Sequence, residues 1–198
     1  MIGAKDLIQL GTLVAAQHGW AAAKAFKAYE MPDGDKARLA ACAVEILKVF
    51  PKAASEDRAA SAWLSAALAV QLERHLSAPV QVVAGVLSVD GTPVHGRREP
   101  VDGPAVFGAE DLHWSGHVWV MVGPYVADIA IFREAASVNC PAELARHVHS
   151  VFGPDKGLYV DHWRRTRRSG LGYEPQYVLS SEEVTRLMGG AYRLISPA

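Results

Sequence analysis

Hydrophobic residues in the first third of the chain recur at intervals of three and four positions, the spacing of one face of an α-helix. This pattern predicts a first helix over residues 4–29 and a second over about 35–50. Pro32 and Gly34 in "MPDGDKAR" separate the two helices, and Pro51 ends the second. The N-terminal part is therefore expected to be a pair of helices.

A third helix is expected in "SEDRAASAWLSAALAVQLERHL", the segment that starts at Ser55. Ser55 is a suitable N-cap, and the carboxylates of Glu56 and Asp57 would favour the positive end of the helix dipole. Alanine has no side-chain entropy to lose and lets a neighbouring element approach closely. We expect this alanine-rich helix, over about 56–76, to pack tightly.

The pattern then changes to short, valine-rich runs, which are typical of strands. Three strands are predicted, over 79–89, 117–122 and 125–132. Only a Gly-Pro pair separates the last two, which leaves room for a hairpin turn and nothing longer. Residues 90–114 are rich in glycine and proline and predict a long irregular loop, which is uncommon unless functional or disordered.

The last third of the chain returns to helical signals. A helix is expected at about 140–151, with Pro141 in its first turn. "SSEEVTRLMGGAY" begins with Ser180 and Glu183 at the spacing of a capping box, which predicts a further helix. Helices followed by an antiparallel sheet with helices at one side are typical of the α+β class.

Composition limits the class of protein. The chain has 198 residues, 50% of them hydrophobic and 21% charged, with a formal net charge of −1. This profile is typical of an ordinary globular domain. The near-neutral charge attracts neither acidic nor basic partners, and no nucleic-acid partner is expected. We expect one domain over 1–198, made of an N-terminal helical part (1–54), a core (55–135) and a C-terminal helix and strand extension (136–198).

Cysteine usage and hydropathy indicate the compartment. Cys42 and Cys140 form no CxxC pair, so neither a disulfide framework nor a zinc finger is expected, and a reducing cytoplasm is the simplest setting. Asp6 and Gln9 interrupt the first apolar stretch, which is unlike a signal peptide. No apolar run approaches the roughly 18 residues that a membrane span requires, and no membrane partner is expected.

The candidate catalytic residues lie in "SGHVWVMVGPYVADIAIFRE", where Asp128 follows His117 by eleven positions. Counting outward from the turn, position 130 would face His117, so Asp128 would lie diagonally opposite it. Diagonal neighbours are about 7–8 Å apart at the backbone, within reach of their side chains. Nucleophilic catalysis needs a base and a third group that fixes its tautomer. His117 and Asp128 are therefore candidates for base and orienter.

The alanine-rich helix, the strand with "VVAGV", and "GHVWVMV" followed by Asp128 resemble the transglutaminase-like branch of the papain-like cysteine peptidases, over about residues 60–130. Members of that family carry a cysteine at the start of a helix and a glycine about two dozen residues later. A His-Ala-Trp-Val-Glu motif follows, and then an aspartate about eleven residues further on. The resemblance implies a papain-like core, with the alanine-rich helix packed on an antiparallel sheet and extra N-terminal helices.

The resemblance also implies a function: hydrolysis or transfer of an acyl group at an amide, thioester or ester carbonyl of a peptide or small acyl substrate, without a cofactor. His117 would act as general base and acid, with Asp128 as its orienter. Trp63, Trp119 and His113 would line the substrate site, with Trp119 as a wall beside the histidine. The oxyanion donor would be a backbone N–H at the start of the helix, and the 90–114 loop would be a lid.

The expected helix holds no cysteine, so the position of the nucleophile has two interpretations. Counting back from Gly85 places the family's cysteine at Ala62, whereas aligning Ser65 with the small polar residue one turn later places it at Ser61. With Ser61 there, His117 would take the serine proton during attack, as in a serine hydrolase. With Ala62 there, the chain would be a catalytically inactive binding or assembly module.

Two other groupings provide weaker alternatives. The histidines of "HWSGH" and "RHVHS", at 113, 117, 147 and 149, could form a metal site with Asp128, but no HExxH-like spacing supports this, and no metal is expected. Four arginines within 164–168 stand near Trp163 and Tyr173 and could clamp a carboxylate or phosphate. A solvated charged face is the simpler interpretation. The sequence does not determine the oligomeric state.

Overall fold

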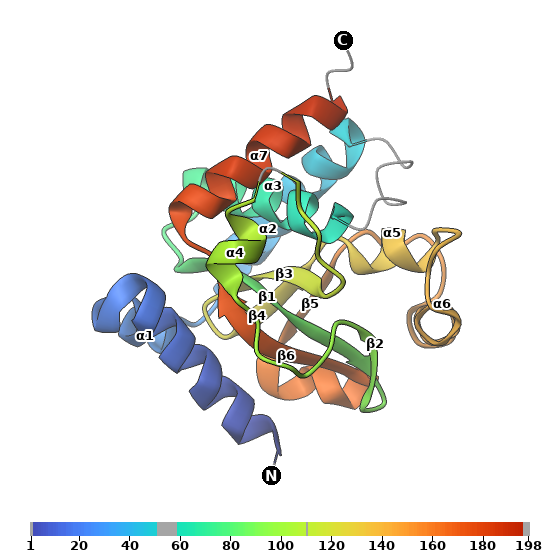
Figure 1. The fold of residues 1–198 in the computed structure, drawn as a ribbon, viewed down its shortest axis with the longest axis horizontal. Helices are drawn as coiled ribbons and strands as arrows, with labels where there is room; N and C mark the ends of the chain where they lie inside the picture. Colours follow the sequence, from blue (N-terminus) through green and yellow to red (C-terminus); the bar gives the residue numbers. More distant parts are fainter. Residues whose placement is uncertain (1, 51–58, 110, 196–198) are drawn as a thin grey trace.

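The computed structural model of the chain describes residues 2–50, 59–109 and 111–195, and it is an α+β fold (Figure 1). The helices are α1 (Ile2–Ala28), α2 (Asp33–Val49), α3 (Ala60–His75), α4 (Gly103–Phe107), α5 (Ile131–Ala135), α6 (Ala142–Phe152) and α7 (Ser181–Ile195), with a 3₁₀ helix η2 (Trp163–Ser169). The strands are β1 (Val80–Val89), β2 (Thr92–His95), β3 (His117–Val122), β4 (Tyr125–Asp128), β5 (Tyr159–His162) and β6 (Leu171–Val178).

Strand β1 is the centre of one antiparallel sheet. Its residues 80–85 pair with β3 and its residues 87–89 pair with β2, while β6 pairs with residues 83–89. From β3 the sheet continues through β4 to β5. Because β2 and β6 both pair with the second half of β1, that half has a neighbour on each side.

Helices cover both faces of this sheet. Val118 and Val120 of β3 pack with residues of α2, α3 and α7, while Trp119 and Met121 pack with residues of α1, α6 and η2. The expectation of helices at one side is therefore wrong. The reason that helices cover both faces lies in β3, because all six residues of this strand are buried. A continuous apolar run such as "HVWVMV" is typical of a strand covered on both faces.

The two N-terminal helices form where their hydrophobic spacing predicts them. α1 is kinked at Gly19, whose φ of 86° and ψ of 166° are not helical. Leu10 and Phe26, from the two halves of α1, are both fully buried in the face of the core that contains Trp119. α1 is thus part of the hydrophobic core on both sides of its kink.

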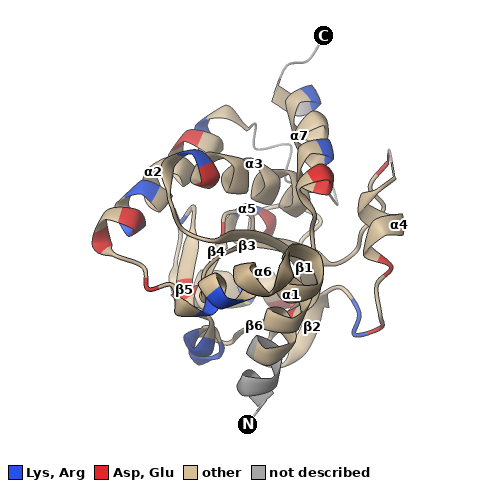
Figure 2. Ribbon diagram, turned by 90° about the vertical axis from the view of Figure 1, so that its left-hand side faces the viewer, with Lys and Arg blue, Asp and Glu red and all other residues tan. Residues whose placement is uncertain are grey.

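Helix α2 keeps a charged outer surface. Acidic and basic positions are interleaved along it (Figure 2), and three ion pairs join side chains three residues apart. Cys42 of α2 is buried among apolar side chains and is free, as expected for a small hydrophobic residue. None of the described helices is both long and apolar enough to cross a membrane.

Three sequence predictions about element bounds need correction or a limit. The 90–114 segment is not wholly irregular, because it contains β2 and α4. The strand predicted over 125–132 ends at Asp128 and gives way to α5. The third helix begins at Ala60, and the predicted cap at Ser55 lies outside the described residues.

Other local predictions are confirmed. The turn at Gly123–Pro124 joins Val122 and Tyr125, which are directly paired. The capping box also forms: the backbone N–H of Glu183 donates to Ser180 Oγ at 3.2 Å, and that of Ser180 donates to Glu183 Oε2 at 2.7 Å. The helix expected at about 140–151 also forms, as α6 at 142–152, but Pro141 is its N-cap residue and not part of its first turn.

Candidate functional site

The β3–β4 hairpin brings His117 and Asp128 into direct contact. His117 Nε2 lies 2.7 Å from Asp128 Oδ2, and both side chains are 0% exposed. The register pairs Val120 with Ala127, so Asp128 falls diagonally opposite His117, as the count from the turn predicts. This contact joins two of the residues that the sequence singles out.

Asp128 is held as a carboxylate by several donors. The Tyr173 hydroxyl donates to Oδ2 at 2.9 Å, and the backbone N–H groups of Ala130 and Ile131 donate to Oδ1 at 2.9 and 3.1 Å. Burial alone would raise the pKa of Asp128, but His117 and these hydrogen bonds lower it below its ordinary value. The two backbone bonds also turn the chain from β4 into α5, which is why the strand stops at Asp128.

A second carboxylate faces the other nitrogen of the imidazole. Glu134, from α5, places Oε2 3.1 Å from His117 Nδ1, although the direction of this contact does not meet hydrogen-bond geometry. His95, from β2, places Nε2 3.5 Å from the same oxygen. His117 therefore lies between Asp128 and Glu134, and Glu134 lies between two histidines.

The two carboxylates determine the charge of His117. Burial favours the neutral ring and would lower its pKa, but the charges of Asp128 and Glu134 outweigh burial and raise the pKa to about 10. At neutral pH His117 is then an imidazolium whose Nε2–H donates to Asp128 and whose Nδ1 lies near Glu134 without a well-directed hydrogen bond. His95 behaves in the opposite way, because burial lowers its pKa.

Aromatic rings surround the ion group formed by His117, Asp128 and Glu134. The His117 ring stacks on those of His95 and Trp119, with centroids 5.8 and 6.4 Å away, and Tyr173 is tilted against it at 6.3 Å. Trp119 thus lies beside the histidine, where the sequence places it. The apolar surroundings keep water away from the ion pair.

The other two expected substrate-site residues are elsewhere. Trp63 packs with the cluster on the opposite face of the sheet, next to Gly190 of α7. His113 is exposed in the segment before β3. The structure brings neither of them to the His117 ring.

Ser61 lies in the first turn of α3 and is buried, but its hydroxyl is engaged with the strand backbone. Ser61 Oγ accepts a hydrogen bond from the N–H of Val118 at 3.3 Å, and Ser65 Oγ donates to the Val118 carbonyl at 2.8 Å. Val118 faces α3, whereas the adjacent His117 side chain points to the other face, with Trp119. The structure therefore does not bring Ser61 to the imidazole. Ala62 is fully buried in the α3 face of the core.

Gly85, directly paired with His117 across β1 and β3, lies where strands approach too closely for a side chain. A Cβ added there would come 2.0 Å from the Glu174 carbonyl oxygen and 3.0 Å from the Trp119 ring. The residue must be glycine for β6 and Trp119 to pack as they do.

The remaining sequence candidates do not join this group. Among the described residues, no three histidine, cysteine, aspartate or glutamate side chains are arranged to hold a metal ion. His147 Nε2 lies 2.7 Å from the Ser169 carbonyl, and His149 is exposed. Burial and the charge of Glu134 raise the pKa of Cys140 to about 11, which keeps it a thiol.

The arginines of 164–168 are exposed on η2, while Trp163 and Thr166 face inward. Arg165 Nε lies 3.6 Å from Asp161. The cluster thus lies on an exposed face of a 3₁₀ helix.

The sequence does not predict three residues that belong to the site: Glu134, Tyr173 and His95. Glu134 lies six residues after Asp128, where a continued strand would have placed it beyond reach of His117. Tyr173 and His95 come from strands far from His117 in sequence. The alternating run "LGYEPQYV" of β6 is the one available signal, because it predicts a strand that could bring Tyr173 to the sheet.

No protein-family model matches this chain, and neither does any curated protein or solved structure.

Proposed function

We propose that the chain is a catalytically inactive, transglutaminase-like binding or assembly module, in which the histidine–aspartate pair stabilises the fold and does not act on a substrate. One observation carries the proposal: both ring nitrogens of His117 face carboxylates, Asp128 on one side and Glu134 on the other. A general base needs an unprotonated nitrogen within reach of the proton that it removes. His117 has no such nitrogen.

The charge of the ring supports the same conclusion. In a histidine-dependent hydrolase the imidazole alternates between neutral and protonated forms near neutral pH. The pKa of His117 is raised to about 10, so the ring stays protonated throughout the physiological range. A second supporting observation is its burial, since 0% exposure leaves no path for substrate to the ring itself.

The position of Ser61 agrees with an inactive module. Its hydroxyl accepts the N–H of Val118, and its side chain is buried on the α3 side of the sheet. An attacking serine must present its oxygen to both a base and a carbonyl carbon. Ser61, buried and bonded to the strand backbone, is therefore not placed to attack an acyl group.

A serine-directed covalent probe tests the proposal. The full chain is incubated with a fluorophosphonate and its intact mass is measured, with the Ser61→Ala variant as the matched control. We expect no stoichiometric adduct on either protein. Stoichiometric labelling of the wild type that disappears in Ser61→Ala would establish an activated serine and overturn the proposal.

A further inference from the structure

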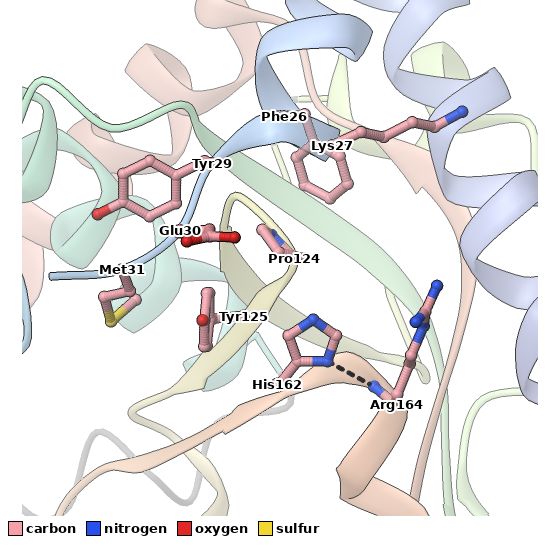
Figure 3. A pocket seen from close by; sticks show the side chains of 9 residues that line it. All are labelled: Phe26, Lys27, Tyr29, Glu30, Met31, Pro124, Tyr125, His162 and Arg164. Carbon is pink, nitrogen blue, oxygen red and sulfur yellow. Dashed lines mark hydrogen bonds between the residues drawn. The ribbon is translucent and has the colours of Figure 1, made fainter.

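A cavity of about 490 Å³ lies between the end of α1, the β3–β4 turn and the start of η2 (Figure 3). It is remote from the His117 ion group, which none of its lining residues belongs to. Its apolar lining comes from Met31, Pro124 and the half-buried Tyr125, and Phe26, also among the lining residues, is fully buried. A mostly preformed cavity with an apolar floor and a few polar groups is typical of small-molecule sites.

The walls of this cavity are fixed by hydrogen bonds. The N–H of Trp163 donates to the Pro124 carbonyl at 2.8 Å, which joins the start of η2 to the hairpin turn. The Tyr29 hydroxyl donates to Asp35 at 2.7 Å, which holds the connection between α1 and α2. A ligand would thus find the three segments already in place, with little ordering cost.

His162 offers the cavity a hydrogen-bond donor. Its Nδ1 accepts the backbone N–H of Arg164 at 3.2 Å, so the proton of the neutral ring is on Nε2. Figure 3 shows that second nitrogen turned away from the Arg164 backbone and toward the side of Phe26 and Pro124. The ring meets Tyr125 edge-on, with centroids 5.2 Å apart and an interplanar angle of 85°, which keeps it oriented.

Opposite charges line two sides of the cavity. Figure 3 shows the Glu30 carboxylate on one side and the Arg164 guanidinium on the other, with His162 between them. Within the described part of the chain, neither side chain has an ion-pair partner. Lys27 contributes its stem, since its ammonium turns away and lies over Gly11 of α1.

We propose that this cavity binds a small zwitterion with an apolar body, of the class of aromatic and aliphatic α-amino acids. Arg164 and the Nε2–H of His162 bind the carboxylate, Glu30 binds the ammonium, and Tyr125 and Met31 contact the apolar side chain. A ligand with an anion alone leaves Glu30 unpaired, and one with a cation alone leaves Arg164 unpaired. The zwitterion satisfies both walls together. This inference deepens the proposed binding function and rests on it.

Calorimetric titration with three matched compounds tests the assignment: L-phenylalanine, phenylacetate without the ammonium, and phenethylamine without the carboxylate. We expect phenylalanine to bind at least about tenfold more tightly than either of the others, the loss that follows when one charge-assisted hydrogen bond is removed. Arg164→Gln should weaken phenylalanine and phenylacetate by a similar factor and leave phenethylamine unchanged. Glu30→Gln should weaken phenylalanine and phenethylamine and leave phenylacetate unchanged.

Arg168→Gln is the control, because Arg168 is exposed on the same 3₁₀ helix and does not line the cavity. It should bind all three compounds as the wild type does. Absence of phenylalanine binding, equal affinity for the three compounds, or equal losses in Arg164→Gln and Arg168→Gln would each overturn the assignment. None of these results concerns Ser61, so a failure here is distinguishable from serine labelling, which would overturn the proposed function.

Discussion

His117 and Tyr173 donate to the same oxygen of Asp128, although they come from strands on opposite sides of β1. The carboxylate therefore links the two edges of the central strand through one buried polar group. Low surrounding polarity strengthens these bonds and makes the loss of any partner costly. The stability of the sheet and the protonation of the site are consequently coupled.

Removing the Tyr173 hydroxyl tests this link. Tyr173→Phe keeps the ring and deletes one hydrogen bond to a buried carboxylate, and we expect the free energy of unfolding to fall by about 1.5–3 kcal/mol. Urea denaturation followed by tryptophan fluorescence measures the change. Tyr192→Phe is the matched control, because Tyr192 is exposed, and it should leave the urea midpoint unchanged.

Replacing His117, the cation between the two carboxylates, should lower the free energy of unfolding further. His117→Asn leaves Asp128 and Glu134 facing an uncharged group in a buried site, and such losses cost about 3–5 kcal/mol. Adding Asp128→Asn to this variant removes one of the stranded charges, so the double variant should lose less than the sum of the two single variants. Strict additivity in the double-mutant cycle would show that the two residues are not coupled.

The raised pKa of His117 predicts how stability depends on pH. Because its folded pKa of about 10 exceeds the ordinary value of 6.5, the folded state binds more protons between these values. The contribution of His117 is fully present below pH 6.5 and is lost as pH rises toward 10. The lowered pKa of Asp128 acts at the acid end, where its contribution is lost as pH falls through and below the ordinary carboxyl range.

Two measurements check this dependence. The free energy of unfolding should decline from pH 6.5 to 10 more steeply in the wild type than in His117→Asn. Nitrogen-15 NMR of the histidine rings should show both nitrogens of His117 protonated at pH 8. A ring that titrates near 6.5 would contradict the ion group as described.

Gly85 provides a prediction that depends on shape alone. A Cβ in Gly85→Ala would meet the Glu174 carbonyl oxygen at 2.0 Å, which forces β1 and β6 apart. We expect a loss of about 3 kcal/mol or more, at the upper end of overpacking effects. Gly34→Ala is the control: nothing lies within 4 Å of its added Cβ, and alanine favours the α2 helix by about 0.5–1 kcal/mol. Equal stability of the two variants would be inconsistent with the close strand contact.

Sequence reasoning succeeds here where the signal is local. The hairpin follows from two strands joined by Gly-Pro, and that hairpin alone places Asp128 beside His117. The capping box at Ser180 and Glu183 needs only four residues of sequence. These predictions depend on neighbours along the chain, so no knowledge of the tertiary fold is required.

The errors arise where tertiary contacts decide. Asp128 looks like one more strand position, but its Oδ1 accepts the amides of Ala130 and Ile131. These bonds start α5, which carries Glu134 to the second nitrogen of His117. Nothing in "YVADIAIFRE" marks this turn with glycine or proline. The sequence of α3 likewise does not predict the face of β3 against which this helix packs. Because it packs on the face opposite the His117 side chain, Ser61 is separated from His117.

The pairing of β6 with β1 has a consequence for how the chain is made. The Gln9 side chain of α1 donates to the Pro175 carbonyl at 2.9 Å, and Val83 pairs with Val178. A ribosome must therefore synthesise residue 178 before the first helix can reach its place against the sheet. Until then the apolar side of α1 is uncovered in the nascent chain, and the long sequence separation of these contacts predicts slow completion of folding. Late completion of this face of the core, after β6 has been made, is thus a property of the topology.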